Sequence, residues 1–420
     1  MGNIFHSIKN DKKKIMNIIL ANLTSNNANK GCVALCISTL YLIDKLLKEN
    51  NIPYKFYLPD SGHTSIGKHT YDVNGNEIEF YSCSYVNWTD TKTFLKQLAL
   101  RIFKREEHKT NRNIFKNADF IFDIGQGDSF SDIYGKQRFE MIDRIHKVAR
   151  INKIPYCILP QTIGPFKDEN IKNQALKSIN KADVVMARDL QSLSFVNDNC
   201  AQKDVDEYID VAFFMPFERQ SFAKEKTHVG INVSSLLWHG GYTKANQFGL
   251  KSDYQKLITE IIEYFLKIPN VQLHIVPHVV SAESHVENDY EVSYHLSNKY
   301  KDVILAPLFL SPIYAKNYIA GMDFFLGARM HATIAAFSSG VPVFPMAYSR
   351  KFNGLFEDTL SYSFMGDLIN HDAETILTEL RHAFEQRDRL VEIIRERMNG
   401  VVEKKKDLLI NNISKFLKVK

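Results

Sequence analysis

The sequence has no long apolar run, and its first residues are not expected to act as a secretory leader. Among its 420 residues, no stretch reaches the roughly eighteen apolar residues that a membrane-spanning helix needs. The N-terminus lacks the apolar core of a signal peptide, and His6 stands where N-myristoylation requires Ser or Thr. These absences predict a cytoplasmic protein.

Cysteine is also scarce, and metal-binding motifs are missing. The five cysteines are scattered and contain no CxxC pair, which predicts free thiols in a reducing compartment. Cys32 and Cys36 are one helical turn apart, and we interpret them as core residues. There is no HExxH motif and no Asp-rich cluster, so we predict no metal site and no cofactor. The basic stretch at 90–116 carries no nucleic-acid-binding motif; we interpret it as a solvated helix face and expect no nucleic-acid partner.

The composition is that of a soluble globular protein of two domains. Hydrophobic residues make up 45% and charged residues 24% of the chain, and 420 residues exceed one ordinary domain. The net charge of +5 favours solubility, with a polyanionic ligand or a membrane surface as alternatives.

Strand-like and helix-like segments alternate along the chain, which predicts an α/β fold with parallel sheets. The pattern restarts after a polar crossover within residues 208–226. We therefore predict two Rossmann-like domains that face a cleft, residues 1–218 and 219–420, with a long C-terminal helical region in the second. The basic tail, residues 404–420, is expected to pack on the protein or to touch anionic lipid at the inner face of the cell membrane.

One segment, residues 323–351, predicts a charged site. Its pattern indicates a strand at 323–326, a helix from 328 to 339 that Gly340 ends, and a second strand at 341–348.

Basic residues fall at two places in this segment, the start of the predicted helix and the end of the second strand. Arg329 and His331 fall in the first helical turn, where free N–H groups favour an anion, and Lys351 follows the second strand. A buried helix start is a costly place for two basic groups without a counter-ion. Ligands of open parallel sheets bind at the carboxyl ends of strands. The segment therefore predicts a site for a small, multiply charged anion.

Other distinctive polar residues also follow predicted strands, so they are expected to line the same cleft. The GQGDS loop at 125–129 either cradles phosphate or makes a tight turn. Arg188 is either an anion ligand or the partner of Asp189 in a local salt bridge. His239 and His278 are either substrate contacts or structural residues. The strand-end candidates are Gly127, Asp128, Ser129, Gln161, Arg188, Asn232 and His278, and His239 is a further candidate in a predicted mobile loop beside Gly240 and Gly241.

Over roughly residues 28 to 360, the sequence resembles the polysaccharide pyruvyl transferase family. The resemblance is carried by GQGDSFSDIYG (125–135), QTIGPF (161–166), ARD (187–189), DVAFF (210–214) and, above all, residues 327–358. The last piece holds a Gly-x-Arg-Met-His helix start, then Gly-Val-Pro, then Tyr-x-x-Lys. These motifs are fairly specific together and weak singly.

The resemblance implies a fold like that of GT-B glycosyltransferases and a reaction with phosphoenolpyruvate as co-substrate. Its pyruvyl group would pass to two hydroxyls of a sugar or lipid-linked oligosaccharide as a ketal, with release of phosphate, in surface polysaccharide biosynthesis. The resemblance implies donor binding by Arg188, Arg329, Met330 and Lys351, and catalysis by His331 with Arg329. The other strand-end candidates and His239 are expected to be acceptor or loop contacts.

The chain departs from the family pattern at one loop and leaves two alternatives open. The family often has Asn-x-Gly-Asp where this chain has Asn29-Lys30-Gly31-Cys32, which leaves that loop's role in acceptor binding open. The first alternative is a GT-B glycosyltransferase that holds a nucleotide sugar through Glu357 or Asp358. The second is a non-catalytic relative that binds a sugar or an anion.

Overall fold

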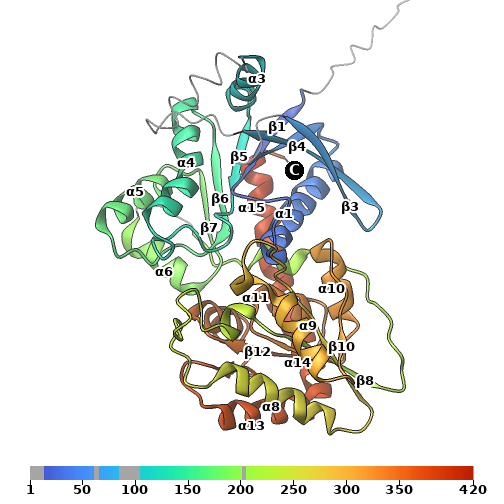
Figure 1. The fold of residues 1–420 in the computed structure, drawn as a ribbon. Coiled ribbons are helices and arrows are strands. Elements are labelled where there is room, and N and C mark those ends of the chain that lie inside the picture. Colours follow the sequence, from blue (N-terminus) through green and yellow to red (C-terminus); the bar gives the residue numbers. More distant parts are fainter. Residues whose placement is uncertain (1–13, 61–65, 85–104, 201–204, 420) are drawn as a thin grey trace, which may run out of the picture.

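The computed structural model describes residues 14–60, 66–84, 105–200 and 205–419. It contains two sheets, each covered by helices, that lie one above the other in Figure 1. The predicted α/β class with parallel sheets and a long C-terminal helical region is confirmed. Residues 90–104 of the basic stretch lie outside the described part; its remainder belongs to α3 (Arg105–Lys116).

The first sheet has seven strands in the order β3-β4-β2-β1-β5-β6-β7. All neighbouring pairs are parallel except β3 with β4. The strands are β1 (Met16–Ala21), β2 (Tyr54–Asp60), β3 (Gly67–Val73), β4 (Asn76–Ser84), β5 (Phe120–Asp123), β6 (Tyr156–Gln161) and β7 (Val184–Ala187).

The antiparallel hairpin of β3 and β4 departs from the predicted all-parallel pattern. Asn74 and Gly75 join the two strands, and both have positive φ, 53° and 78°. An Asn-Gly pair between two extended segments is a strong signal for a two-residue hairpin turn. The hairpin could therefore have been predicted from these two residues.

Helices cover both faces of the first sheet. α4, α5 and α6 form one apolar core with it, and α1 packs on the opposite face. They are α1 (Lys30–Glu49), α4 (Lys136–Asn152), α5 (Glu169–Ile179) and α6 (Leu190–Asn199).

The second sheet has six parallel strands in the order β10-β9-β8-β11-β12-β13. A short 3-10 helix, η1 (Val211–Phe214), lies in the connection between the sheets. The strands are β8 (Thr227–Asn232), β9 (Val271–Ile275), β10 (Ile304–Leu305), β11 (Phe324–Gly327), β12 (Val343–Ala347) and β13 (Gly366–Asp367).

The second sheet also carries helices, and the chain then returns to the first sheet. The helices are α7 (Ser235–Trp238), α8 (Tyr254–Leu266), η2 (His285–Glu287), α9 (Asp289–Lys299), α10 (Pro312–Ala320), α11 (Met330–Ser338), α12 (Arg350–Asn353), η3 (Gly354–Thr359), α13 (Ala373–Glu385), α14 (Arg387–Arg397), η4 (Met398–Val402) and α15 (Glu403–Leu417). No helix in the described ranges is both long and apolar enough to cross a bilayer.

The last helix, α15, packs against the first sheet rather than the second (Figure 1). The ring of Phe416 meets the edges of Phe120 and Phe122 in β5, at centroid distances of 5.2 Å each. The assignment of residues 1–218 and 219–420 to two domains stays a prediction. That assignment puts α15 in the second domain, although α15 packs against the first sheet. Four apolar side chains of α15, those of Leu409, Ile413, Phe416 and Leu417, are buried against the protein. The expected lipid contact of the tail stays a prediction.

Candidate active site

The start of α11 holds Arg329 in a buried ion-pair network. Arg329 is the N-cap residue, and its backbone N–H donates to Asn232 Oδ1 at 3.0 Å. Its guanidinium lies 2.8 Å from Asp289 Oδ1 and 3.0 Å from Glu287 Oε2. Burial opposes the charge, but these two carboxylates raise the pKa of Arg329 above its usual range. Two carboxylates of the protein, Glu287 at the end of η2 and Asp289 at the start of α9, therefore serve as counter-ions for Arg329.

His331 lies in the first turn of the same helix, between the two domains. A Cβ added to Gly31 at the start of α1 would lie 2.2 Å from His331 Nδ1, so only glycine lets the imidazole approach so closely. On its other side, His331 Nε2 lies 3.7 Å from Asp210 Oδ2. Burial lowers the pKa of His331 and outweighs the opposite effect of Asp210; Arg188 and Lys351 lower it further.

Arg188 reaches the same point from the first sheet. It follows β7 and is 5% exposed; Nη1 donates to Asp210 Oδ2 at 2.8 Å and Nε to Thr162 Oγ1 at 3.0 Å. The neighbouring Asp189 instead caps α6 by accepting from Ser192 N. The alternative of a local salt bridge with Asp189 is therefore wrong: Asp210, close to both Arg188 and His331, is the partner.

Lys351 and Asp128 form an ion pair that connects the second sheet with the first. Lys351 follows β12, and its Nζ lies 3.3 Å from Asp128 Oδ2 in the GQGDS loop. The same oxygen accepts from Tyr134 Oη at 3.1 Å. Burial opposes ionisation of both partners, but the effect of the ion pair is larger. The pKa of Asp128 is therefore lowered and that of Lys351 is raised.

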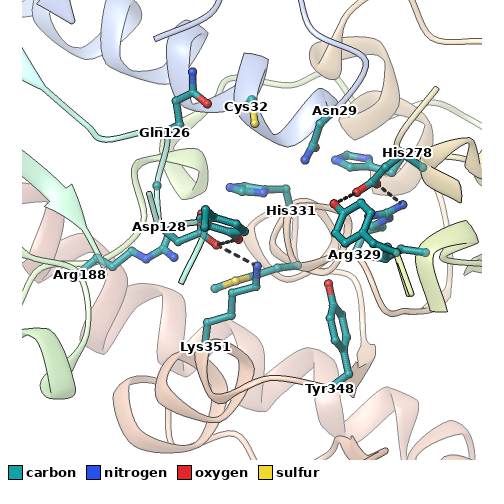
Figure 2. Close-up of a pocket in the computed structure, with 16 residues that line it drawn as sticks. Asn29, Cys32, Gln126, Asp128, Arg188, His278, Arg329, His331, Tyr348 and Lys351 are labelled. Carbon is teal, nitrogen blue, oxygen red and sulfur yellow. Dashed lines mark hydrogen bonds and ion pairs between the residues drawn. The ribbon is translucent and has the colours of Figure 1, made fainter. Parts of the chain in front are cut away.

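These groups line one pocket of about 160 Å³ between the sheets, shown in Figure 2. Arg188 enters from one side, Arg329 from the other, and Lys351 and His331 lie between them. Residues of the two domains therefore share one small, charged space. Its lining is Asn29, Cys32, Gln126, Gly127, Asp128, Tyr134, Arg188, Leu236, Tyr242, His278, Glu287, Arg329, Met330, His331, Tyr348 and Lys351.

Two imidazoles in the pocket have ring nitrogens that make no hydrogen bond among the described residues. Both ring nitrogens of His278 and Nε2 of His331 are buried and make no hydrogen bond. Burial lowers the pKa of His278 to about 3, helped by His331, Arg329 and Lys30, so its ring is neutral. A buried polar atom left unpaired costs about 1–3 kcal/mol. These nitrogens are therefore available to a ligand.

The structure brings together most of the predicted site residues. Eight of them line the pocket: Gly127, Asp128, Arg188, His278, Arg329, Met330, His331 and Lys351. Gly127 has a φ of +89°, and a Cβ there would lie 3.2 Å from Arg188 Nη1, so the turn needs glycine.

Four predicted residues lie outside the lining and support its walls. Ser129 accepts hydrogen bonds from Arg138, and Gln161 donates to Asp123. Asn232 donates to Val276 O and accepts from Arg329 N. His239 ends α7 as its C-cap. Gln161 and Asn232 are the last residues of β6 and β8, so these strand ends lie as predicted, but none of the four residues is part of the lining.

Sequence reasoning missed several lining residues because their neighbours in space are distant in the chain. Tyr134 and Tyr242 stand beside the glycines of two loops, the one signal that could have found them. Glu287 precedes α9 and carried no signal. Cys32, interpreted as core, lies instead in the pocket wall, where burial raises its pKa to about 11. Within the described residues, no three His, Cys, Asp or Glu side chains are grouped to hold a metal ion.

The two facing sheets and the returning helix α15 define the class of protein, a GT-B-type fold. The S. aureus MnaA–UDP structure is 11% identical and has a TM-score of 0.57, over 97% of this chain and 98% of that one. UDP-GlcNAc 2-epimerase from Neisseria meningitidis bound to UDP-GlcNAc is 12% identical with a TM-score of 0.56, over 95% and 100%. Anabaena Alr3699/HepE in complex with UDP-glucose is 11% identical with a TM-score of 0.51, over 95% and 100%.

The sequence identifies the family to which the chain belongs. The polysaccharide pyruvyl transferase family model matches residues 29–350, which include the whole pocket lining except Lys351. The chain therefore belongs to the polysaccharide pyruvyl transferase family. No curated protein sequence matches it.

Proposed function

We propose that the protein transfers the pyruvyl group of phosphoenolpyruvate to two hydroxyls of a sugar, forming a ketal and releasing phosphate. The observation that carries the proposal is the convergence of Arg188, Arg329, Lys351 and His331 on one pocket. Phosphoenolpyruvate presents a carboxylate and a phosphate on three carbons. Guanidinium groups bind both kinds of anion through paired hydrogen bonds, and a lysine adds a point charge.

The size of the pocket favours a small donor over a nucleotide sugar. Its volume of about 160 Å³ is below the roughly 300–1,000 Å³ typical of pockets for drug-sized ligands. Glu357 and Asp358, the candidate ribose ligands of the alternative, are outside the lining; Glu357 is exposed and accepts from Asn353 Nδ2 at 2.9 Å. These observations favour phosphoenolpyruvate over a nucleotide sugar as donor.

The reaction needs two proton transfers, and His331 is positioned to make them. Protonation of the donor methylene carbon gives C2 oxocarbenium character, and the first sugar hydroxyl adds there. The second hydroxyl then displaces phosphate and closes the ketal. One hydroxyl proton ends in the new methyl group and the other leaves with phosphate.

The environment of His331 fits a shuttle for these protons. Because its pKa is lowered, the imidazole is neutral at pH 7 in the ligand-free protein and accepts a proton from a hydroxyl. The donor's negative charges then stabilise the imidazolium, which returns the proton to the methylene carbon. Arg188 and Lys351 stabilise the leaving phosphate.

The test is ³¹P NMR of the protein with phosphoenolpyruvate and a panel of galactose, mannose and N-acetylmannosamine glycosides. We expect the phosphoenolpyruvate signal to be replaced by inorganic phosphate only when a suitable sugar is present. Consumption of a UDP-sugar without loss of phosphoenolpyruvate would instead support the glycosyltransferase. Donor binding without turnover on any sugar would support a non-catalytic relative.

A variant separates proton transfer from donor binding. His331→Ala is expected to lower kcat by about 100-fold or more, the contribution of one positioned acid–base group, while phosphoenolpyruvate still binds. Isothermal titration with phosphoenolpyruvate and phosphate release measure the two effects. Near-full turnover by His331→Ala would show that another group moves the protons.

We further propose that the reaction serves surface polysaccharide biosynthesis at the cytoplasmic face of the membrane, on a sugar that is free or lipid-linked. The family membership and the sugar-processing names of the structural neighbours support this setting. Incubation with detergent-solubilised lipid-linked oligosaccharide and with the same free oligosaccharide, followed by mass spectrometry, distinguishes the two acceptors.

A further inference from the structure

Two exposed tyrosines from opposite domains stand at the pocket and take no part in donor binding as proposed above. Tyr134, just before α4, is 51% exposed, and Tyr242, in the loop after α7, is 58% exposed. Both line the pocket, so an aromatic surface borders its opening on each side. An exposed aromatic ring beside a charged pocket presents an apolar face next to hydrogen-bonding groups.

The hydroxyl of each tyrosine is held by a carboxylate of the same domain. Tyr134 Oη donates to Asp128 Oδ2 at 3.1 Å, and Tyr242 Oη donates to Glu287 Oε1. The loop of Tyr242 is itself fixed, because Gln247 Oε1 accepts from Tyr242 N at 2.7 Å and Gln247 N donates to Gly240 O at 3.0 Å. The two rings are therefore held in place before any ligand arrives.

Each carboxylate also holds one of the donor-binding cations. Asp128 pairs with Lys351 at 3.3 Å and Glu287 pairs with Arg329 at 3.0 Å. The pocket thus contains two matching sets, each with a tyrosine, a carboxylate and a cation. They are Tyr134–Asp128–Lys351 and Tyr242–Glu287–Arg329.

We propose that the acceptor sugar binds at this opening, with its ring against Tyr134 and Tyr242 and its hydroxyls donating to Asp128 and Glu287. This inference rests on the proposed function for the identity of the ligand as an acceptor, but its binding test does not need turnover. The tyrosine and the carboxylate of each set suit a neutral sugar. Aromatic faces pack on its C–H groups, and carboxylates accept from its hydroxyls, whereas a carboxylate repels the anionic donor.

Donor binding prepares these carboxylates for the sugar. When the phosphate and carboxylate of the donor take over hydrogen bonds from Lys351 and Arg329, Asp128 and Glu287 regain free lone pairs. Both carboxylates are partly buried, so a charge left without a partner there is costly, and sugar hydroxyls supply the missing hydrogen bonds. The carboxylates then orient the hydroxyls toward the donor C2.

Three kinds of tyrosine variant test this site. Tyr134→Ala and Tyr242→Ala remove the ring; Tyr134→Phe and Tyr242→Phe keep it. Tyr314→Ala is the matched control, because Tyr314 in α10 is also 58% exposed but is absent from the pocket lining. The probes are methyl β-galactopyranoside, methyl α-mannopyranoside and N-acetylmannosamine, followed by saturation-transfer difference NMR with and without phosphoenolpyruvate.

We expect at least one probe to bind the native protein and each alanine variant to bind it about fivefold more weakly, the effect of one lost aromatic contact. The phenylalanine variants should bind it within about twofold of the native protein, because the ring contact is kept. Tyr314→Ala should also bind it within about twofold, because Tyr314 lies outside the site. Phosphoenolpyruvate affinity, measured separately by titration, should be unchanged in every variant. The proposal is overturned if the alanine variants bind the probe like the native protein, or if no probe binds. If a probe binds with this tyrosine dependence but phosphoenolpyruvate does not bind, the sugar site stands and the proposed donor fails.

Discussion

At the scale of single residues, Asp210 connects the two groups on which the proposed chemistry depends. Its Oδ2 accepts from Arg188 at 2.8 Å and lies 3.7 Å from His331 Nε2, while Oδ1 accepts from Ala212 N at 2.9 Å. It is 1% exposed, so water screens these interactions little. Asp210 is a positioning residue: it orients an arginine of one domain and a histidine of the other.

The first prediction concerns Asp210→Asn, which keeps the shape and removes the charge. Asp210 raises the pKa of His331, so its loss should lower that pKa further. A base with a lower pKa stays unprotonated to lower pH. The acidic limb of the kcat/KM profile should therefore move to lower pH, by roughly one unit for an opposite charge at this distance.

A pH series of phosphate release between pH 4 and 8 measures this shift. Asp407→Asn, an exposed change on α15, is the control and should leave the profile in place. A shift of the acidic limb to higher pH in Asp210→Asn, or an unchanged limb, would contradict the assigned role.

At the scale of elements, the start of α1 packs closely against the start of α11. Asn29 caps α1 by accepting from Gly31 N at 2.9 Å, and Lys30 N donates to His278 O at 3.2 Å across the domain boundary. Residues Asn29 to Cys32, where the sequence departs from the family pattern, are therefore the cap and first turn of α1 and form part of the wall behind His331. Gly31 is the residue of this segment that the close approach requires.

The second prediction is that Gly31→Ala displaces His331 while the fold survives. The added Cβ would lie 2.2 Å from His331 Nδ1 and 2.6 Å from its Cγ, so the ring must move. Misplacement of a catalytic group by about 1 Å can lower turnover by about 100-fold. Phosphate release and the melting temperature together measure activity and folding.

Gly400→Ala is the matched control for the same chemical change. A Cβ at Gly400 meets nothing within 4 Å, so turnover should be unchanged. Alanine is the better helix former by about 1 kcal/mol, so the free energy of unfolding should not fall. Native-like turnover in Gly31→Ala would show that the position of His331 is not critical.

At the scale of the whole molecule, a buried lysine fastens the connection between the sheets. Lys316 in α10 is 1% exposed, and its Nζ donates to Met215 O at 2.8 Å and to Phe213 O at 3.3 Å. Burial lowers its pKa to about 7. The second domain thereby holds the segment that carries Asp210.

The third prediction is a stability change with pH that depends on Lys316. Between about pH 7 and 10.5, the unfolded chain keeps this proton while the native protein loses it. The unfolded state then binds more protons, so stability rises with pH, by at most about 1.4 kcal/mol per unit. Lys316→Met removes this term. The free energy of unfolding of the native protein minus that of the variant should increase from pH 7 to pH 9.

Urea unfolding at pH 7, 8 and 9 measures the difference. Lys404→Met, the same substitution at an exposed position of α15, is the control and should leave the change of stability with pH as it is in the native protein. A difference between native protein and Lys316→Met that is flat with pH would mean that the buried lysine stays charged.

Much of the fold was within reach of sequence reasoning because it follows from local rules. Apolar periodicity predicted β11, α11 and β12, and Gly340, with a φ of +79°, follows the end of α11 as expected. The β3–β4 hairpin was missed although Asn74-Gly75 signals it. The packing of α15 on the first sheet could not be predicted, because its apolar face fits any complementary surface.

For the site, the sequence alone determined the residue types and the strand ends that carry them, because parallel strands deliver their carboxyl ends to one edge. Seven of the eight predicted lining residues could be named in this way, and Met330 came only from the family resemblance. Tertiary structure alone decided their partners: Asp289 and Glu287 for Arg329, Asp210 for Arg188, Asp128 for Lys351, and Gly31 against His331. Ion pairing and close packing depend on distance in space, and these partners come from the other domain or from remote loops.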